Sequence, residues 1–203
     1  MPMAHRNQLL FAVVIALIFA ASTASALGSG GHNRDGMVIA LTMGHGWSSI
    51  DINDDQSNGD VSTFVPAFKI GWARSDNLVG YIGISGWKRS NYYSYAPSSV
   101  SNFNFVAEIY WFPTAQGFWL KGGAGTGSID VDVSTIDPTK RISIQEGGFT
   151  YTLGAGIEYR TSDTFAFGIN YDYTNVDIGD LDFVTGVSAT NHVLGISLNW
   201  YQE

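Results

Sequence analysis

The segment FTYTLGAGIEYRTSDTFAFGINYDY, residues 149–173, decides the fold. Large apolar side chains occupy every second position from Phe149 to Tyr159, and small, polar or charged residues fill the positions between them. After the break at Thr161–Asp163 the same pattern runs from Phe165 to Tyr173. A strict period of two predicts two β-strands joined as a hairpin, each with one apolar face and one polar face.

The distribution of side chains on the two faces indicates where they point. The apolar face of the hairpin carries aromatic rings near its ends and aliphatic groups in its middle, and the other face carries charge. A soluble barrel would turn the large apolar residues inward. A membrane barrel turns them outward as a band with aromatic girdles and keeps a polar lumen. The hairpin therefore predicts strands that cross a membrane.

The first residues predict export. His5 and Arg6 precede an apolar run of about 13 residues, 9–21, which is followed by the small-residue segment 22–26. The run is too short to span a bilayer as a helix. We predict that residues 1–26 are a cleaved secretory signal peptide, and that no lipoprotein forms, because no Cys follows the cleavage site.

The remaining domain, residues 27–203, has the length of a single domain. It lacks cysteine, so no disulfide can stabilise the exported chain. Loss of Arg6 leaves 9 basic and 18 acidic residues, a net charge of −9, which argues against nucleic acid as a partner.

The same alternation recurs along the chain and predicts eight strands. The apolar positions on the strand near residues 78–89 are ambiguous, because Val79 and Tyr81 compete in register with Ile82 and Ile84. The expected strands lie at about 36–47, 61–73, 78–89, 102–112, 118–128, 149–160, 165–174 and 190–201. Strands of this length cross a bilayer when tilted, and closure of the sheet leaves no unpaired edge in lipid.

Short and long connections alternate between these strands. Residues 75–77, 113–117 and 161–163 form short turns, whereas 51–60, 90–101, 129–146 and 175–188 form long polar loops, of which 129–146 is the longest. Outer-membrane barrels have short periplasmic turns and longer extracellular loops. The predicted fold is therefore an all-β, eight-stranded, antiparallel up-and-down transmembrane barrel, in the outer membrane of a Gram-negative bacterium.

With this architecture the chain resembles the small eight-stranded outer-membrane barrels, the OmpA-type membrane domain and the OmpX-like group, over residues 36–201. The resemblance implies recognition by the barrel assembly machinery and contact with outer-membrane lipid and lipopolysaccharide. Such barrels usually end in a terminal aromatic, whereas here Gln202 and Glu203 follow Tyr201. The implied assembly signal is the alternation Leu194, Ile196, Leu198 and Trp200.

The inward face predicts a cluster of charges in the lumen. Eight strands enclose an interior that side chains can fill. An unpaired charge there would cost several kcal/mol, so these charges are expected to pair. Inward glycines leave room for them. The cluster is interpreted as a structural plug, and the resemblance to OmpA-type barrels also allows a gated ion path. Its expected members are Lys69, Glu108, Lys121, Glu158, Arg160 and Asp172.

Catalytic and metal sites are not predicted. Lipid-modifying barrels need a Ser and a His with a carboxylate. The exported domain has three histidines, His32, His45 and His192, and we expect the last two near lipid head groups, on neighbouring strands. The stretch from Asp51 resembles a calcium loop, but Gln56 replaces its required Gly. We expect no cofactor, no bound metal and no enzymatic activity.

The long loops hold the remaining candidates. Acidic side chains at 51, 54 and 55 suit weak contacts with ions or partners, or simply a solvated loop. The tyrosines suit recognition of a surface protein or glycan, or belong to the outer aromatic girdle. The loop candidates are Asp51, Asp54, Asp55, Tyr92, Tyr93 and Tyr95.

The sequence thus predicts a structural or surface-interaction role, in membrane integrity or in adhesion through the long loops. The alternative is transport, through a narrow channel or by an OmpW-like route for small or hydrophobic molecules, which a lateral opening in one wall would favour. A lipid A-modifying enzyme and a soluble exported barrel are further alternatives.

Overall fold

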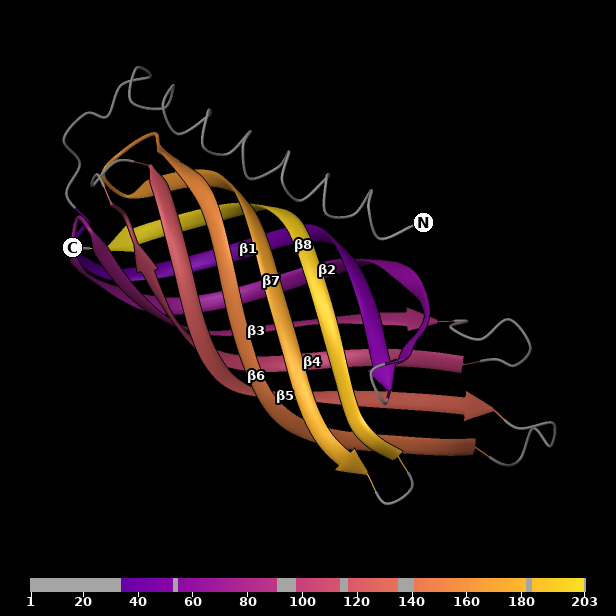
Figure 1. Cartoon of the computed structure of the whole chain (residues 1–203). Coiled ribbons are helices and arrows are strands. Elements are labelled where there is room, and N and C mark those ends of the chain that lie inside the picture. The colour runs from indigo at the N-terminus through magenta and orange to yellow at the C-terminus, as the bar shows by residue number, and fades with distance from the viewer. Residues whose placement is uncertain are drawn as a thin grey trace.

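The structure, a computed structural model, describes residues 34–52, 55–90, 98–113, 117–134, 141–181 and 184–202. In these ranges eight antiparallel strands form one closed barrel in chain order, and β8 pairs with β1 (Figure 1). The predicted fold is confirmed. The strands are β1 (Gly36–Ile52), β2 (Asp55–Ser75), β3 (Leu78–Ser90), β4 (Ser98–Trp111), β5 (Phe118–Ser134), β6 (Arg141–Arg160), β7 (Phe165–Leu181) and β8 (Val184–Gln202).

The outward face is apolar, as the alternation predicts. The ambiguity on β3 is resolved: Val79 and Tyr81 are buried inside, whereas Ile82 and Ile84 are 57% and 41% exposed. The Tyr81 ring fits inside because its partner on β2, Gly71, has no side chain. A Cβ at position 71 would lie only 2.6 Å from the ring.

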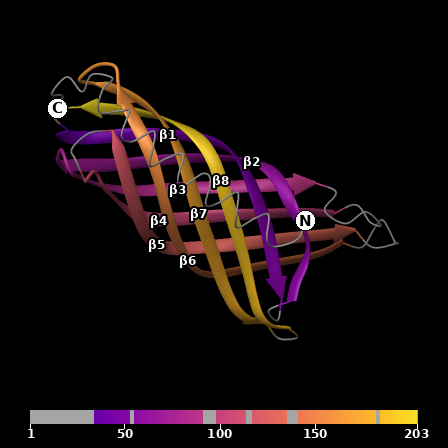
Figure 2. The same ribbon diagram turned by 45° about the horizontal axis from the view of Figure 1, so that its top comes forward.

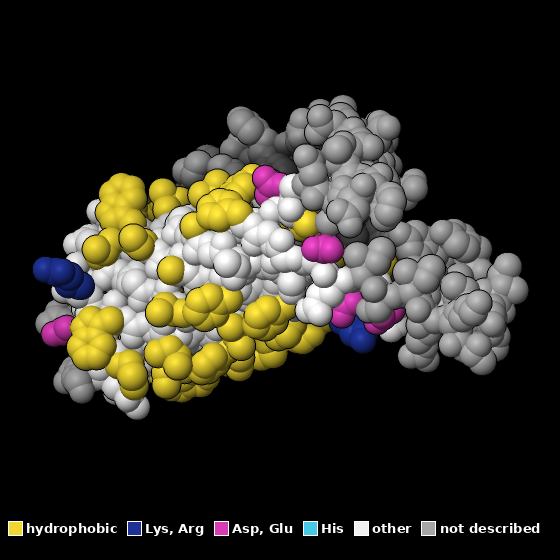
Figure 3. Space-filling model, turned by 90° about the horizontal axis from the view of Figure 1, so that it is seen from below, with side chains coloured by type: hydrophobic (Ala, Val, Ile, Leu, Met, Phe, Trp, Pro, Cys, Tyr) yellow, Lys and Arg dark blue, Asp and Glu magenta, His cyan; other side chains and the backbone are white. Residues whose placement is uncertain are grey.

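Large apolar side chains surround the barrel in an apolar belt, part of which Figure 3 shows with charged residues toward its two ends. A surface of this kind suits contact with lipid. The belt includes Met43, Trp47, Phe64, Phe68, Ile70, Trp72, Ile82, Ile84, Phe103, Phe105, Ile109, Trp111, Leu120, Phe149, Tyr151, Leu153, Tyr159, Phe167, Ile169, Leu194, Ile196 and Trp200.

The two ends of the barrel differ. At the turn end, β1 begins and β8 ends, since Met37 pairs with Gln202, and short connections join β2 to β3, β4 to β5 and β6 to β7. At the other, extended end, every strand except β3 runs several residues past its predicted limit. Most of the predicted loop 129–146 is strand, because β5 continues to Ser134 and β6 starts at Arg141.

This difference has a physical reason. Beyond the belt the outward face becomes polar, whereas the inward face is apolar and buried at Ile129, Val176 and Ala189, so the pattern of apolar residues outside that predicted the strands is reversed there. The short alternations at 129–134 and 141–145 carry the remaining signal.

The extended end divides into two four-stranded sheets. One consists of β7, β8, β1 and β2 and the other of β3 to β6, and the two run in different directions in Figures 1 and 2. The β2–β3 ladder ends at Ala67↔Ser85 and the β6–β7 ladder at Phe149↔Asp177, although all four strands continue outward. Beyond Asp177, β7 bends at Gly179, whose φ is 78° and whose N–H donates to the Asp177 carboxylate.

No helix among the described residues is long and apolar enough to cross a membrane. The predicted signal peptide, residues 1–26, lies outside the described ranges and stays a prediction.

Candidate functional site

The centre of the lumen holds a charge-balanced ionic cluster. Glu108 on β4 accepts from Lys69 Nζ at 2.6 Å through Oε2 and from Lys121 Nζ at 2.8 Å through Oε1. Lys121 also pairs with Asp172 Oδ1 at 2.9 Å, and Lys69 donates to the Tyr110 hydroxyl at 2.7 Å. Two cations thus face two carboxylates in a buried setting, and we call these four charged residues the central ionic cluster.

A second ion pair closes the lumen near the turn end. Arg34 Nε lies 3.2 Å from Glu158 Oε1, and the Arg34 guanidinium lies 3.7 Å from the centre of the Phe112 ring. Glu158 Oε2 also accepts from Asn199 Nδ2 and from the Tyr201 hydroxyl, each at 2.8 Å. This carboxylate therefore has a charged partner and two neutral donors.

The predicted lumen residues separate into these two groups. Lys69, Glu108, Lys121 and Asp172 come together, whereas Glu158 belongs to the pair with Arg34. Arg34 was not predicted as a lumen residue, because it precedes β1 and has no place in a strand alternation. Its backbone N–H and its guanidinium bind Asp76 in the β2–β3 turn, which fixes its position.

Arg160, the sixth predicted member, lies apart from both groups. Its guanidinium lies 4.2 Å from the centre of the Tyr201 ring and donates to the Asp163 carbonyl oxygen at 2.6 Å in the β6–β7 turn. It shares the inward face of β6 with Glu158 but sits at the rim of the turn end.

Apolar clusters lie on both sides of the ionic groups. The turn-end cluster consists of Val38, Ala40, Ala73, Val79, Tyr81, Tyr110, Phe112, Trp119, Ala166 and Tyr201. The extended-end cluster consists of Val65, Trp87, Val100, Ile129, Val176, Ala189 and Val193, and it draws members from both four-stranded sheets. The lumen is thus filled along its length by apolar, ionic and apolar layers.

The described residues line two small cavities in the interior. The larger, about 30 Å³, lies against the central ionic cluster and reaches Ala67, Ile84 and Ser85 at the end of the β2–β3 ladder. The smaller, about 10 Å³, is lined by polar groups that include Asn170 and Ser197. These volumes suit one or two water molecules each at most.

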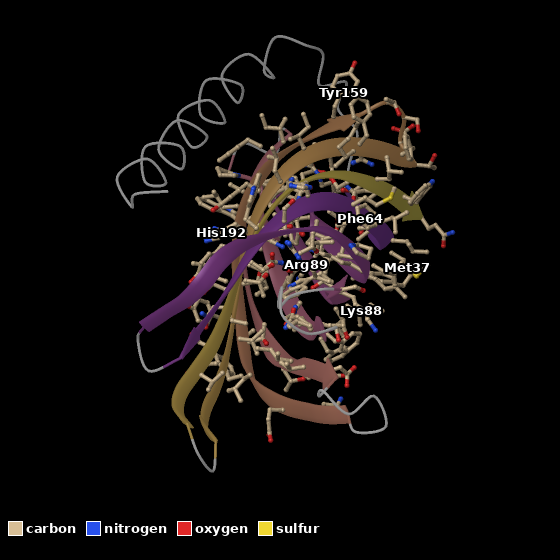
Figure 4. The ribbon with its side chains drawn as sticks, turned by 90° about the vertical axis from the view of Figure 1, so that its right-hand side faces the viewer. Met37, Phe64, Lys88, Arg89, Tyr159 and His192 are labelled. Atoms are coloured by element: carbon tan, nitrogen blue, oxygen red, sulfur yellow. The ribbon has the colours of Figure 1, made fainter. Side chains whose placement is uncertain are left out.

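Two histidines lie on the outer surface at the extended side of the apolar belt, as predicted, and Figure 4 labels one of them, His192. His45 Nε2 lies 2.6 Å from the Ser62 hydroxyl oxygen, and His192 Nδ1 lies 2.7 Å from the Tyr171 hydroxyl oxygen. Trp47 joins them, since it pairs with His192 across β1 and β8 and contacts His45 edge-on. The sequence analysis did not foresee the contact with Ser62.

The side chains of the predicted loop candidates are not among those that the structure describes. The backbones of Asp51 and Asp55 belong to the tips of β1 and β2, but their side chains are not described. The other candidates lie outside the described residues: Asp54, Tyr92, Tyr93, Tyr95 and His32.

The predicted assembly-signal residues share the outward face of β8. Three of them, Leu194, Ile196 and Trp200, belong to the apolar belt, and Leu198 is half-buried. Their role in assembly stays a prediction. Within the described ranges, no three His, Cys, Asp or Glu side chains group closely enough to hold a metal ion.

Comparisons with known proteins agree with this geometry. The family model "Outer membrane protein beta-barrel domain" matches residues 11–201. The crystal structure of Neisserial surface protein A is similar at 14% identity, with a TM-score of 0.55, 82% of this chain and 97% of that chain covered. Ail, the attachment invasion locus protein of Yersinia pestis, is similar at 15% identity, with a TM-score of 0.58 and coverage of 81% and 99%. Its complex with the heparin analogue sucrose octasulfate is similar at 14% identity, with a TM-score of 0.55 and coverage of 81% and 99%. No curated protein sequence matches the chain.

Proposed function

Because the chain belongs to the outer membrane protein beta-barrel domain family, and so to the outer membrane of Gram-negative bacteria, we propose that it acts at the cell surface through its strand extensions. In this proposal the turn end faces the periplasm and the extended end faces outward, as in other outer-membrane barrels. The observation that carries it is the filled, charge-balanced lumen.

The lumen supports a barrel that does not conduct solutes along its axis. The Glu108 carboxylate bridges two lysines, and apolar clusters lie on either side of the ionic layer. To pass an ion, the barrel would have to break buried pairs, at about 3–5 kcal/mol each. A transport function therefore requires a route other than the axis.

The strand extensions supply the surface for interaction. Beyond Phe149, the outermost belt residue of β6, the β5–β6 ladder continues to Ser134↔Arg141. At about 3.4 Å per residue, the hairpin extends about 27 Å along the strands past Phe149, or roughly 20 Å along the barrel axis at a tilt of about 40°. Long regular strands hold side chains in fixed positions and suit a recognition role better than an unstructured loop would.

The charge of the extended end favours a basic partner. Residues 48–62, 88–101, 129–147 and 175–189 together hold eleven acidic and four basic side chains. Ail has been solved with an anionic heparin analogue. A polyanion would be repelled by the extended end of the present chain, so we propose a positively charged protein surface as its partner.

The proposal assigns no catalytic role. The contact between Ser62 and His45 provides two groups of a hydrolase triad, but no carboxylate among the described side chains hydrogen-bonds to His45. We expect His45→Gln to leave the lipid A of expressing cells unchanged, as mass spectrometry of extracted lipid A would show. Lipid and lipopolysaccharide around the belt and the barrel assembly machinery are its proposed general partners.

Two measurements test the surface role. Purified protein in planar bilayers should give no steady conductance. Expressing bacteria should adhere to an immobilised basic protein such as lysozyme, and a barrel with residues 129–146 replaced by a two-residue turn should lose that adhesion. The control, Asp35→Asn with Asp163→Asn at exposed positions of the turn end, should keep it.

The same variants separate adhesion from membrane integrity. If the shortened barrel restores detergent resistance to a deletion strain but not adhesion, the extensions serve the surface and the barrel wall serves integrity. Stable channel openings, or adhesion no better than that of cells without the protein, would contradict the proposal.

A further inference from the structure

The gap between β2 and β3 begins where the wall still faces lipid. The ladder ends at Ala67↔Ser85. Phe64, three residues beyond Ala67 on β2, is 62% exposed, and Phe103, which pairs with Gly86 across β3 and β4, is 52% exposed. The apolar belt thus continues on both sides of the gap. Figure 4 labels Phe64 on β2 and the first charged residues of β3 beyond the gap.

The residues at the gap favour an unpaired edge. Pro66 is the first β2 residue beyond the ladder, and it has no N–H group to donate to β3. Gly86, the β3 residue that would face it in the same register, has no side chain to cover the gap. Unpaired backbone groups in hydrocarbon cost several kcal/mol each, so an edge at this depth favours a molecule that can hydrogen-bond to it.

The larger cavity lies in the lumen against the last paired residues of this ladder. Ile84 faces lipid at 41% exposure, yet it lines the same cavity as Lys69 and Glu108. Ala67 and Ser85, the last paired residues of the ladder, form the cavity wall between them. The end of the ladder is therefore the part of the wall that separates this cavity from the lipid-facing surface beside the gap.

A second observation concerns Trp87, the next inward-facing residue of β3 after Ser85, which does not line this cavity but belongs to the same apolar cluster as Val65, which does. Trp87 follows Gly86 on β3 and points inward, with 5% of its surface exposed. Its indole Nε1 is buried and has no hydrogen-bond partner. Buried indole N–H groups usually find an acceptor, so an oxygen atom that enters at the gap would meet an unsatisfied donor.

We propose that the β2–β3 gap is a lipid-side entrance that binds an uncharged single-chain amphiphile, such as a long-chain alcohol, from the bilayer. The hydroxyl group occupies the cavity beside Ser85, where about 30 Å³ suits a group the size of water. The alkyl chain lies outside against the apolar side chains of Phe64, Phe68 and Ile84.

The electrostatics select the head group. Lys69 and Lys121 are already neutralised by Glu108 and Asp172. A carboxylate head would add an unpaired charge to a buried site, which is costly, whereas a hydroxyl both donates and accepts without changing the charge. This inference is independent of the surface role, which depends on the extensions beyond the belt.

The absence of cysteine from the chain allows a direct test of access. Ser85→Cys and Ser197→Cys place the same thiol beside the gap and behind the β8 wall, where Ser197 pairs with both Thr42 and Gly168. In phosphatidylcholine vesicles, each thiol is reacted with a membrane-soluble alkyl maleimide and with a charged, water-soluble maleimide.

We expect the alkyl maleimide to modify S85C at least tenfold faster than S197C, and faster than the charged reagent modifies S85C. Equal rates at the two positions would overturn the proposal, because the membrane-soluble reagent would then pass the wall beside the gap no faster than the fully paired wall at β8. A faster reaction of S85C with the charged reagent would also overturn it, because that thiol would be reached from water.

A second experiment tests the ligand itself. A photoreactive dodecanol analogue with a diazirine should label β2 and β3 peptides of the native chain, and the corresponding dodecanoate at pH 8 should label them at least fivefold less. The pair A67C/S85C joins the last cross-strand partners, so its oxidised form should lose the label and its reduced form should regain it. Labelling unaffected by oxidation, or equal labelling by the carboxylate, would contradict the proposed site and its head-group preference.

Discussion

Glu108 is the residue on which the central ionic cluster depends. Its two carboxylate oxygens accept from Lys69 at 2.6 Å and from Lys121 at 2.8 Å, and all three side chains are buried. Glu108→Gln keeps the shape and removes the charge. Lys121 retains Asp172, but Lys69 loses its only carboxylate partner among the described ion pairs and keeps only the Tyr110 hydroxyl.

The expected cost follows from the buried charge. Removal of one partner of a buried ion pair costs about 3–5 kcal/mol, because the remaining charge is left uncompensated. With a urea dependence of about 2 kcal/mol per molar, a loss of 4 kcal/mol lowers the unfolding midpoint by about 2 M. The midpoint is measured by tryptophan fluorescence of protein folded in lipid vesicles.

A double variant tests whether charge balance, rather than packing, causes the loss. Lys69→Met with Glu108→Gln restores neutrality, because Lys121 and Asp172 remain as a pair. We expect it to be at least 2 kcal/mol more stable than the sum of the two single changes predicts. Glu146→Gln, the same chemical change at an exposed position of β6, serves as the control and should shift the midpoint by less than about 0.5 kcal/mol. An E108Q variant as stable as E146Q, or additive single changes, would refute the dry, balanced lumen.

Three further predictions concern other parts of the barrel. Arg34→Ala should cost about 3 kcal/mol in the same assay, because Glu158 loses its cation, whereas the exposed Arg74→Ala should be nearly neutral. Gly156→Ala should cost about 1–3 kcal/mol, since its Cβ would lie 2.4 Å from the Trp119 ring, whereas Gly122→Ala, with 3.8 Å to Leu153, should not destabilise; equal midpoints would contradict the tight lumen. Ile196→Arg, in the apolar belt, should cost about 2–4 kcal/mol in lipid, and the turn-end Asp163→Arg less than 1 kcal/mol; similar losses would argue against the assigned membrane depth.

Much of the barrel could be predicted because alternation is a property of each strand by itself. Phe103, Phe105 and Ile109 face outward and Glu108 inward simply because their positions differ in parity. Parity placed Lys69, Glu108, Lys121 and Asp172 inside, and the cost of an unpaired buried charge predicted that they pair. It could not say which pairs form, because this depends on the register between strands.

Residues outside the alternation were missed or misplaced. Arg34 precedes the first strand, and only its contacts with Asp76 bring it over the lumen. Arg160 has inward parity, but it is the last residue of β6, so its long side chain reaches the turn and the Tyr201 ring instead of the centre. Parity defines a face, whereas depth along the axis decides which partner a charged side chain meets.

The division of the extended end could not be predicted from strand patterns, because it depends on where two neighbouring strands stop pairing. Pro66 and the bend at Asp177–Gly179 mark the places where pairing stops. Neither predicts the end of a ladder unless the register of the facing strand is known. Four strands separate the two gaps, so the sheets meet through the extended-end cluster, where Val65 and Val193 of one sheet pack with Trp87 and Ile129 of the other. Because this cluster is the contact between the two sheets beside the β2–β3 gap, we expect its packing to influence both the width of the gap and the angle between the surface extensions. The proposed lateral entrance and the proposed outer surface therefore share one structural element, the extended-end cluster.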